Sequence, residues 1–217
     1  MFHGLGDACI YPGMSSFDKL ISEGTGAYSK CIEVGLPTVG EYFNNFEYIA
    51  QLSCSKIAAD ANFDGEFNVI GLSQGGLLAR YIVEECEMKG TVRNIVTLGG
   101  PHMGVDGVPK ISNIPLIGPI VDFVAKKLVY IAPVQNWLAP AGYFRDVNNM
   151  AKYEAKSVFL PALNNENQAL KTSKLAALKK ENFGSLNAAM FVMFSEDTII
   201  VPKESAWFQQ YDLDGKI

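Results

Sequence analysis

The strongest constraint on how this chain can fold is the stretch Gly71-Leu72-Ser73-Gln74-Gly75. Residues 67–70 before it are mostly β-branched or aromatic and predict a buried strand, and residues 77–85 after it predict a helix. A sharp strand-to-helix turn holds its central residue in a strained conformation, and flanking glycines make room for it. This context indicates a nucleophile elbow, which presents the Ser73 hydroxyl at the carboxyl end of a sheet. The alternative is an ordinary glycine-rich turn.

Strands and helices alternate along the first half of the chain. We expect strands at 28–34, 67–70, 92–98 and 189–194, and helices at 41–60 and 77–85. Such alternation predicts a parallel sheet with right-handed crossovers, whose functional sites lie at the carboxyl ends of the strands. The expected class is α/β, in the form of an α/β-hydrolase fold: a mainly parallel sheet, helices on both faces and a helical insertion.

The whole-chain properties limit the partners. A length of 217 residues fits a single domain spanning 1–217. The net charge of −5 and the pI near 5.1 argue against nucleic acid as a partner. No apolar stretch reaches about 18 residues, so we expect no membrane-spanning segment, and contact with a membrane surface stays open. We expect no metal and no cofactor, and nothing in the sequence determines the oligomeric state.

The pattern changes between about 103 and 165, where prolines interrupt it and predict an insertion of short helices. A helical stripe within it consists of Ile117, Ile120, Val121, Val124, Leu128 and Ile131. The stripe fits a cap helix packed on the core or one wall of an acyl-chain groove, and both hold if the cap itself forms the groove. A polar, Lys-rich helix near 167–181 is expected to present a solvated face.

Two loops supply further candidate site residues. His3-Gly4-Leu5-Gly6-Asp7 fits the turn that supplies half of an oxyanion hole in α/β-hydrolases, because glycines let backbone N–H groups approach a developing negative charge. Its alternative is a glycine-rich turn with His3 as a packing residue. Asp197 follows the last expected strand and is the candidate acid of a catalytic triad, favoured over Glu196. The alternative for either carboxylate is an exposed loop position.

The base of the triad is missing from the sequence. In this fold it should be a histidine after Asp197, yet the histidines of the chain, His3 and His102, both precede it. Three interpretations stay open: the chain is a fragment, His102 serves in an unusual order, or the protein is not a catalyst. A structural role for His102, hydrogen-bonded in its own loop, is favoured over the role of base. Loss of the base from a catalytic triad lowers kcat by a factor on the order of 10⁶.

The four cysteines are Cys9, Cys31, Cys54 and Cys86. Their spacing matches neither a zinc site nor a C-x-x-C redox motif. An even number fits two disulfides or four buried thiols, and the spacing alone leaves both open.

Together these features resemble the palmitoyl-protein thioesterase family, especially its plant-type members. The resemblance covers nearly the whole chain. It rests on HGLGD (3–7), GLSQGG (71–76), GGPHMGV (99–105), LAPAGY (138–143), FLPALNNE (159–166), EDT (196–198) and VPKESAWF (201–208).

The resemblance implies an α/β-hydrolase that cleaves long-chain fatty acyl (palmitoyl) thioesters from cysteines of proteins or peptides. Ser73 would be the nucleophile, Asp197 the acid, and the backbone N–H groups of Leu5 and Gln74 the oxyanion hole. The family's histidine lies in a G-[DG]-H-L-like segment that would fall beyond residue 217. The chain is therefore expected to be truncated at both ends, to lack terminal strands and to be inactive as it stands.

The resemblance also implies disulfides between Cys54 and Cys86 and between Cys9 and Cys31, in a lysosomal, vacuolar or secreted protein. The expected partners are S-acylated proteins or acyl thioesters. One rival function is a lipase or carboxylesterase that uses the same site on oxygen esters. Another is a non-catalytic acyl-binding protein, which the absent histidine motivates.

Overall fold

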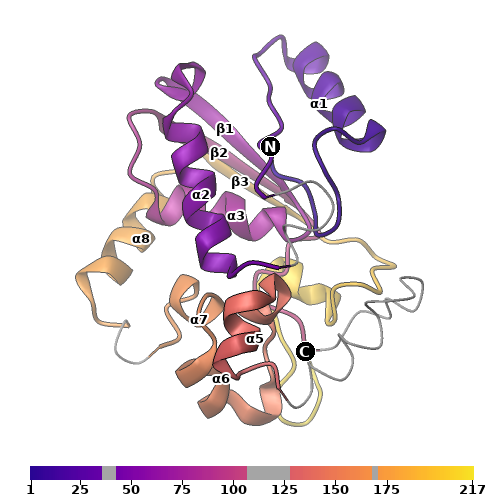
Figure 1. Cartoon of the computed structure of the whole chain (residues 1–217), viewed down its shortest axis with the longest axis vertical. Coiled ribbons are helices and arrows are strands. Elements are labelled where there is room, and N and C mark those ends of the chain that lie inside the picture. The colour runs from indigo at the N-terminus through magenta and orange to yellow at the C-terminus, as the bar shows by residue number, and fades with distance from the viewer. Residues whose placement is uncertain (36–42, 107–127, 168–170) are drawn as a thin grey trace.

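The computed structural model describes residues 1–35, 43–106, 128–167 and 171–217 (Figure 1). Among these residues one sheet forms from β1 (Glu66–Leu72), β2 (Thr91–Leu98) and β3 (Ala188–Val192). The strands lie in the order β1-β2-β3, and both neighbouring pairs are parallel. The α/β class and the parallel sheet predicted from the alternation of elements are confirmed.

Helices surround this sheet. The longer ones are α1 (Pro12–Thr25), α2 (Phe46–Ala58), α3 (Gly75–Glu85) and α8 (Lys174–Gly184). In Figure 1, α2, α3 and α8 lie on one side of the sheet and α1 lies on the other. The remaining described elements are short: α5 (Ala132–Trp137), α6 (Met150–Lys156), α7 (Leu160–Leu163) and the 3-10 turns η1 (Ala61–Phe63), η2 (Ala139–Tyr143), η3 (Val147–Asn149) and η4 (Lys203–Trp207). The described part of the insertion thus consists of short helices, as predicted.

The two faces of the sheet differ in burial. Val69 and Ile95 are adjacent in the β1–β2 register and are buried on the face that α3 covers. On the opposite face Ile70, Val96 and Met190 are neighbours in register, and Met190 is 55% exposed. Successive residues of a strand point to opposite faces, so the main core lies between the sheet and α3.

The insertion packs on α2 through aromatic side chains. The Phe46 ring meets Phe159 edge-on at 4.6 Å between centroids and Tyr143 edge-on at 5.3 Å. Edge-to-face pairs of this kind contribute about 0.5–1.5 kcal/mol beyond the burial of their area. One cluster of buried apolar residues therefore continues from the sheet into the insertion.

The helix expected over 41–60 begins later, at Phe46. Asn45 caps it, because its side chain accepts a hydrogen bond from the Glu47 N–H at 2.8 Å. Phe43 lies before the cap and is 52% exposed, and residues 41 and 42 lie outside the described part of the chain.

The strand expected at 28–34 is wrong. This segment is irregular and is linked to the first residue by two hydrogen bonds, Ile32 N–H to Met1 O at 2.9 Å and Met1 N to Lys30 O at 2.7 Å. Two bonds do not make a ladder, although Ile32 and Val34 are buried as a strand would require.

The Lys-rich helix also differs from its prediction. It begins at Lys174 instead of near 167, since the Ser173 hydroxyl caps it by accepting from the Ala176 N–H at 3.1 Å. Lys179 is 2% exposed and donates to Glu85 Oε1 and to the Ala162 carbonyl, each at 2.7 Å. The expectation of a uniformly solvated face is therefore wrong at Lys179.

Most of the stripe expected in the insertion, namely Ile117, Ile120, Val121 and Val124, lies outside the described residues. Of its remaining members, Leu128 is half-buried and Ile131 is 41% exposed. In the described part of the chain, no helix combines the length and the apolar character needed to cross a membrane.

Candidate active site

Ser73 occupies the turn between β1 and α3 with a backbone φ of 52°. This is the left-handed region, which residues other than glycine adopt at a cost and which often marks functional sites. The Ser73 N–H donates to the Leu98 carbonyl at 2.8 Å, and its own carbonyl accepts from the Gly76 N–H at 2.8 Å. The predicted strand, strained turn and helix are all present.

The glycines on either side allow the backbone to approach closely. A Cβ at Gly71 would lie 2.2 Å from the Gly75 carbonyl oxygen, and a Cβ at Gly75 would lie 2.6 Å from the carbonyl oxygens of Phe2 and His3. Any larger residue would force these segments apart. The segment that begins at Phe2 is thereby held against the elbow, and its N–H donates to the Ile70 carbonyl at 2.8 Å.

The two amides expected to form an oxyanion hole belong to segments that meet at Ser73. A Cβ at Gly4 would lie 3.2 Å from Ser73 Cβ, which places the neighbouring Leu5 in a loop beside the serine. Among the described residues the Leu5 N–H takes part in none of the backbone hydrogen bonds. Gln74 precedes the first residue of α3, and its side chain accepts from the Tyr143 hydroxyl at 3.2 Å.

Ser73 and Asp197 line one cavity of about 370 Å³. Asp197 Oδ1 accepts hydrogen bonds from the N–H groups of residues 199 and 200, at 2.8 and 3.0 Å, so the loop's own amides orient this carboxylate. Glu196 lines the same cavity with an exposed side chain. Apolar side chains provide much of the remaining lining: Leu72, Leu98, Phe194, Ile199 and Ile200.

His102 is fully buried and does not line this cavity. Its Nε2 lies 2.8 Å from Thr97 Oγ1, its Nδ1 has no hydrogen-bond partner among the described residues, and its ring stacks on Phe208 with centroids 4.7 Å apart. Burial first, and then the nearby Arg80 charge, lower the His102 pKa well below its usual value. This placement favours the structural role of His102 over the role of base.

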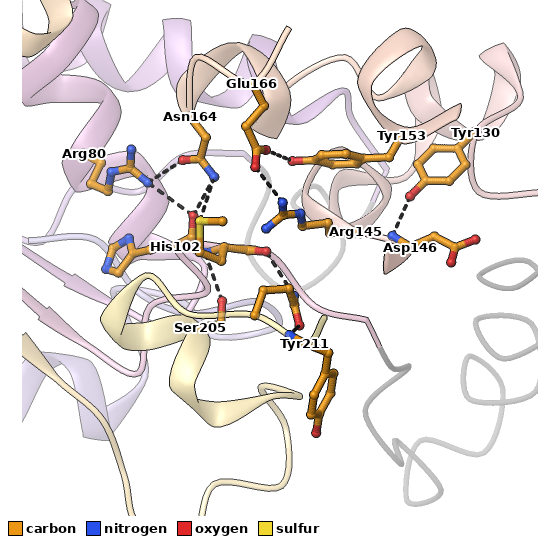
Figure 2. A network of polar contacts seen from close by, with 12 residues as sticks. Arg80, His102, Tyr130, Arg145, Asp146, Tyr153, Asn164, Glu166, Ser205 and Tyr211 are labelled. Carbon is orange, nitrogen blue, oxygen red and sulfur yellow. Dashed lines mark hydrogen bonds and ion pairs between the residues drawn. The ribbon is translucent and has the colours of Figure 1, made fainter. Parts of the chain in front are cut away.

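Figure 2 shows the polar contacts that hold the loop around His102. The His102 carbonyl accepts from Arg80 Nη1 at 3.3 Å and from Asn164 Nδ2 at 2.9 Å, and Arg80 Nη1 also donates to Asn164 Oδ1 at 2.9 Å. From the other side, the Ser205 hydroxyl accepts from the Met103 N–H at 3.0 Å. These partners were not predicted from the sequence, because they come from three segments that are far apart in the chain and no sequence spacing indicates that they are in contact.

His3 is buried next to the acidic side chain of Glu33. His3 Nε2 donates to Glu33 Oε1 at 2.9 Å, and the Cys9 N–H donates to Glu33 Oε2 at 2.9 Å. In the described part of the chain, His3, Cys9 and Glu33 place potential metal-ligand atoms within 4.8 Å of one another. The Cys9 sulfur is bonded to Cys31, however, and offers no thiolate to a metal.

Both disulfides implied by the resemblance are present. The Cys9–Cys31 bond ties the loop after His3 to the irregular segment at 28–34, and the Cys54–Cys86 bond ties α2 to the end of α3.

Comparison with known proteins identifies the family. The sequence model of the family described as Palmitoyl protein thioesterase matches residues 1–217. Palmitoyl-protein thioesterase 1 of Caenorhabditis elegans is 33% identical over 100% of this chain and 72% of that protein. The lysosomal thioesterase PPT2-B of Xenopus laevis is 29% identical over 91% of this chain and 67% of that protein. The solved structure of MenH from S. aureus is similar at a TM-score of 0.43 and 16% identity, over 96% of this chain and 88% of that one, which is too distant to carry an argument. The chain belongs to the palmitoyl protein thioesterase family, whose members are thioester hydrolases.

Proposed function

We propose that Ser73 is the nucleophile of a serine hydrolase that cleaves long-chain fatty acyl thioesters, such as palmitoyl groups, from cysteines of proteins or peptides. The observation that carries the proposal is the position of Ser73, in a strained turn at the carboxyl end of β1 and in one cavity with Asp197. The apolar side chains of that cavity suit an acyl group. The name of the C. elegans relative supports the palmitoyl thioester as the substrate.

In the proposed reaction, Ser73 Oγ gives its proton to the base of the triad and attacks the carbonyl carbon of the thioester, and the carbonyl oxygen becomes an oxyanion. The backbone N–H groups of Leu5 and Gln74 donate hydrogen bonds to that oxyanion. The C–S bond then breaks, the thiolate leaves, and water hydrolyses the acyl-serine. A thiolate is a good leaving group, so acid–base help matters less in the first step than in the second.

Asp197 is proposed to orient a histidine and to stabilise its imidazolium. Neither His3 nor His102 lines the cavity of Ser73. We therefore propose that the base comes from outside residues 1–217. Without that base, residues 1–217 would form the acyl-serine slowly and hydrolyse it more slowly still.

The proposed setting is a lysosome, a vacuole or the secreted compartment, with S-acylated proteins as substrates. The two disulfides and the name of the X. laevis relative support it. We propose a single domain over 1–217, in which the insertion at 103–165 serves as cap and acyl groove. Each buried methylene contributes about 0.8 kcal/mol, so the length of the groove would select the acyl chain.

The test is mass spectrometry of the protein after incubation with a palmitoyl thioester of a short cysteine peptide. We expect palmitoyl-Ser73 to accumulate, because deacylation lacks its base, and we expect no adduct in Ser73→Ala. An adduct of equal yield in Ser73→Ala would refute the role of Ser73 as the nucleophile.

Two matched measurements address the rival functions. Faster acylation of Ser73 by a palmitoyl oxygen ester than by the thioester would favour a lipase or carboxylesterase. Saturable binding of the thioester with no adduct would favour the non-catalytic acyl-binding protein, a second candidate suggested by the absence of a histidine from the cavity lining.

A further inference from the structure

The carboxylate of Glu33 bridges the two ends of residues 3–9, which we call the oxyanion loop. One oxygen accepts from His3 Nε2 and the other from the Cys9 N–H, both at 2.9 Å. The His3 side chain is 0% exposed and that of Glu33 is 23% exposed, so water competes little for the bond between them. Hydrogen bonds to an ionised carboxylate are roughly twice as strong as those between neutral groups.

Glu33 is itself held in place. Cys31, two residues earlier in the chain, is bonded covalently to Cys9, and the Ile32 N–H donates to the Met1 carbonyl at 2.9 Å. The carboxylate therefore projects from a fixed segment and is not the end of a mobile side chain on the loop it contacts.

His3 and Gly4 link Glu33 to the serine. His3 Nδ1 lies 3.0 Å from the Gly4 carbonyl. Because Glu33 holds the ring through Nε2, the position of Nδ1 beside this carbonyl is fixed as well. Gly4 lies against Ser73 and its carbonyl carbon is bonded to the Leu5 nitrogen, so fixing this carbonyl also fixes the direction of the Leu5 N–H.

The oxyanion loop needs such stabilising contacts from another segment because of its glycines. Gly4 and Gly6 flank Leu5, and Gly6 has a φ of 76°. Glycine allows close approach to the serine but also gives the backbone more conformations to lose. An oxyanion donor is effective only when it is held in position before the reaction.

We propose that Glu33 is a positioning residue for the thioesterase reaction: through His3 and Cys9 it orients the oxyanion loop so that the Leu5 N–H donates to the oxyanion formed at Ser73. The inference rests on the proposed function, since it assigns a role in that reaction's oxyanion hole. Glu33 makes no contact with the substrate in this role.

The test measures the rate of palmitoyl-Ser73 formation by mass spectrometry over a range of thioester concentrations. In Glu33→Ala we expect the limiting rate to fall about 100-fold, as when one oxyanion-hole donor is removed, and the half-saturating concentration to stay within about twofold. Glu33→Gln keeps the shape but only one acceptor oxygen, so it should show the same selective fall in rate and decides the matter if Glu33→Ala does not fold. Glu87→Ala is the matched control, because Glu87 is exposed and has no side-chain hydrogen bond in the described part of the chain.

A second probe separates positioning from general damage to the structure. In the matched dithioester, sulfur replaces the carbonyl oxygen and accepts hydrogen bonds poorly. The Glu33 variants should therefore slow acylation by the dithioester less than about threefold.

An equal fall with both probes, or an unchanged limiting rate with the thioester, would overturn the positioning role. If the unmodified protein forms no adduct at Ser73, the proposed function fails and this inference fails with it. That outcome is distinct, because it is seen without any change at Glu33.

Discussion

Replacing His102 by phenylalanine would remove an ionisable imidazole ring that the fold buries in its neutral form. The ring is 0% exposed and lies between Phe208, stacked at 4.7 Å, and Phe191, edge-on at 5.1 Å. A phenyl ring suits this aromatic site. His102→Phe therefore removes the titratable group while keeping the packing of the aromatic rings.

The effect on stability depends on pH, and its sign follows from the lowered pKa. Burial, followed by the Arg80 charge, holds the folded His102 pKa well below the unfolded value of about 6.5. Below about pH 6.5 the unfolded chain therefore binds a proton that the folded protein does not. The stabilising contribution is fully present above that pH and is lost as the pH falls toward the folded pKa, by up to about 1.4 kcal/mol per unit.

The cost at neutral pH should be small. His102→Phe loses the contact with Thr97 Oγ1, worth about 1 kcal/mol, and leaves that hydroxyl without this partner. It also removes the buried Nδ1 that lacks a partner among the described residues, whose burial costs roughly 1–3 kcal/mol. These terms offset one another, so we expect a change within about 1–2 kcal/mol at neutral pH.

The assay is urea unfolding of both proteins from about pH 7.5 down to about pH 5. The free energy of unfolding should fall with pH more steeply in the unmodified protein than in His102→Phe. Thr97→Val is the control: it should lose stability at every pH and keep the steeper slope, since His102 remains. Parallel curves for the unmodified protein and His102→Phe would refute the argument that the fold keeps this ring neutral.

Three further predictions concern the framework of the site. Gly75→Ala should destabilise the protein by roughly 1–3 kcal/mol in urea unfolding, since its Cβ would lie 2.6 Å from two backbone oxygens; unchanged stability would contradict the close approach. Asn164→Ala should cost about 1–3 kcal/mol, seen as a lower melting temperature, because it removes a donor to the His102 carbonyl and an acceptor of Arg80. Replacing Cys54 and Cys86 together by serine should cost roughly 3–4 kcal/mol in the chain-entropy model. Thiol alkylation of the unfolded, unreduced protein should label neither cysteine, and labelling of both would contradict that bond.

The elbow could be predicted from sequence because the strand, the serine and the helix that form it are consecutive in the chain. Strand, serine and helix follow one another within residues 66–85, and the glycines at 71 and 75 are required by atoms of that same unit and of Phe2 and His3. The shared cavity of Ser73 and Asp197 follows from topology, because parallel strands bring their carboxyl ends to one edge. The catalytic roles of both residues remain predictions.

Other features depend on contacts between residues that are far apart in the chain, and these could not be predicted from the sequence. A run of β-formers at 28–34 becomes a strand only with a neighbour to pair with, and here it meets residue 1 through two hydrogen bonds. The composition of its helix predicts a solvated Lys179, yet this side chain is buried and its ammonium is paired with the Glu85 carboxylate. The bonds of Glu33 join residues 24 and 30 positions apart, and no periodicity reports a contact of that kind.

The connection between β2 and β3 has a consequence for how this site can change over evolution. The two strands are neighbours in the sheet, yet residues 99–187 lie between them, including the whole insertion. The entropy of closing a loop grows only with the logarithm of its length, so doubling such a connection costs about 0.6 kcal/mol. Segments can therefore be added to or removed from this connection with little penalty to the pairing of β2 with β3. The walls of the proposed acyl groove can therefore diverge between relatives while the elbow stays unchanged.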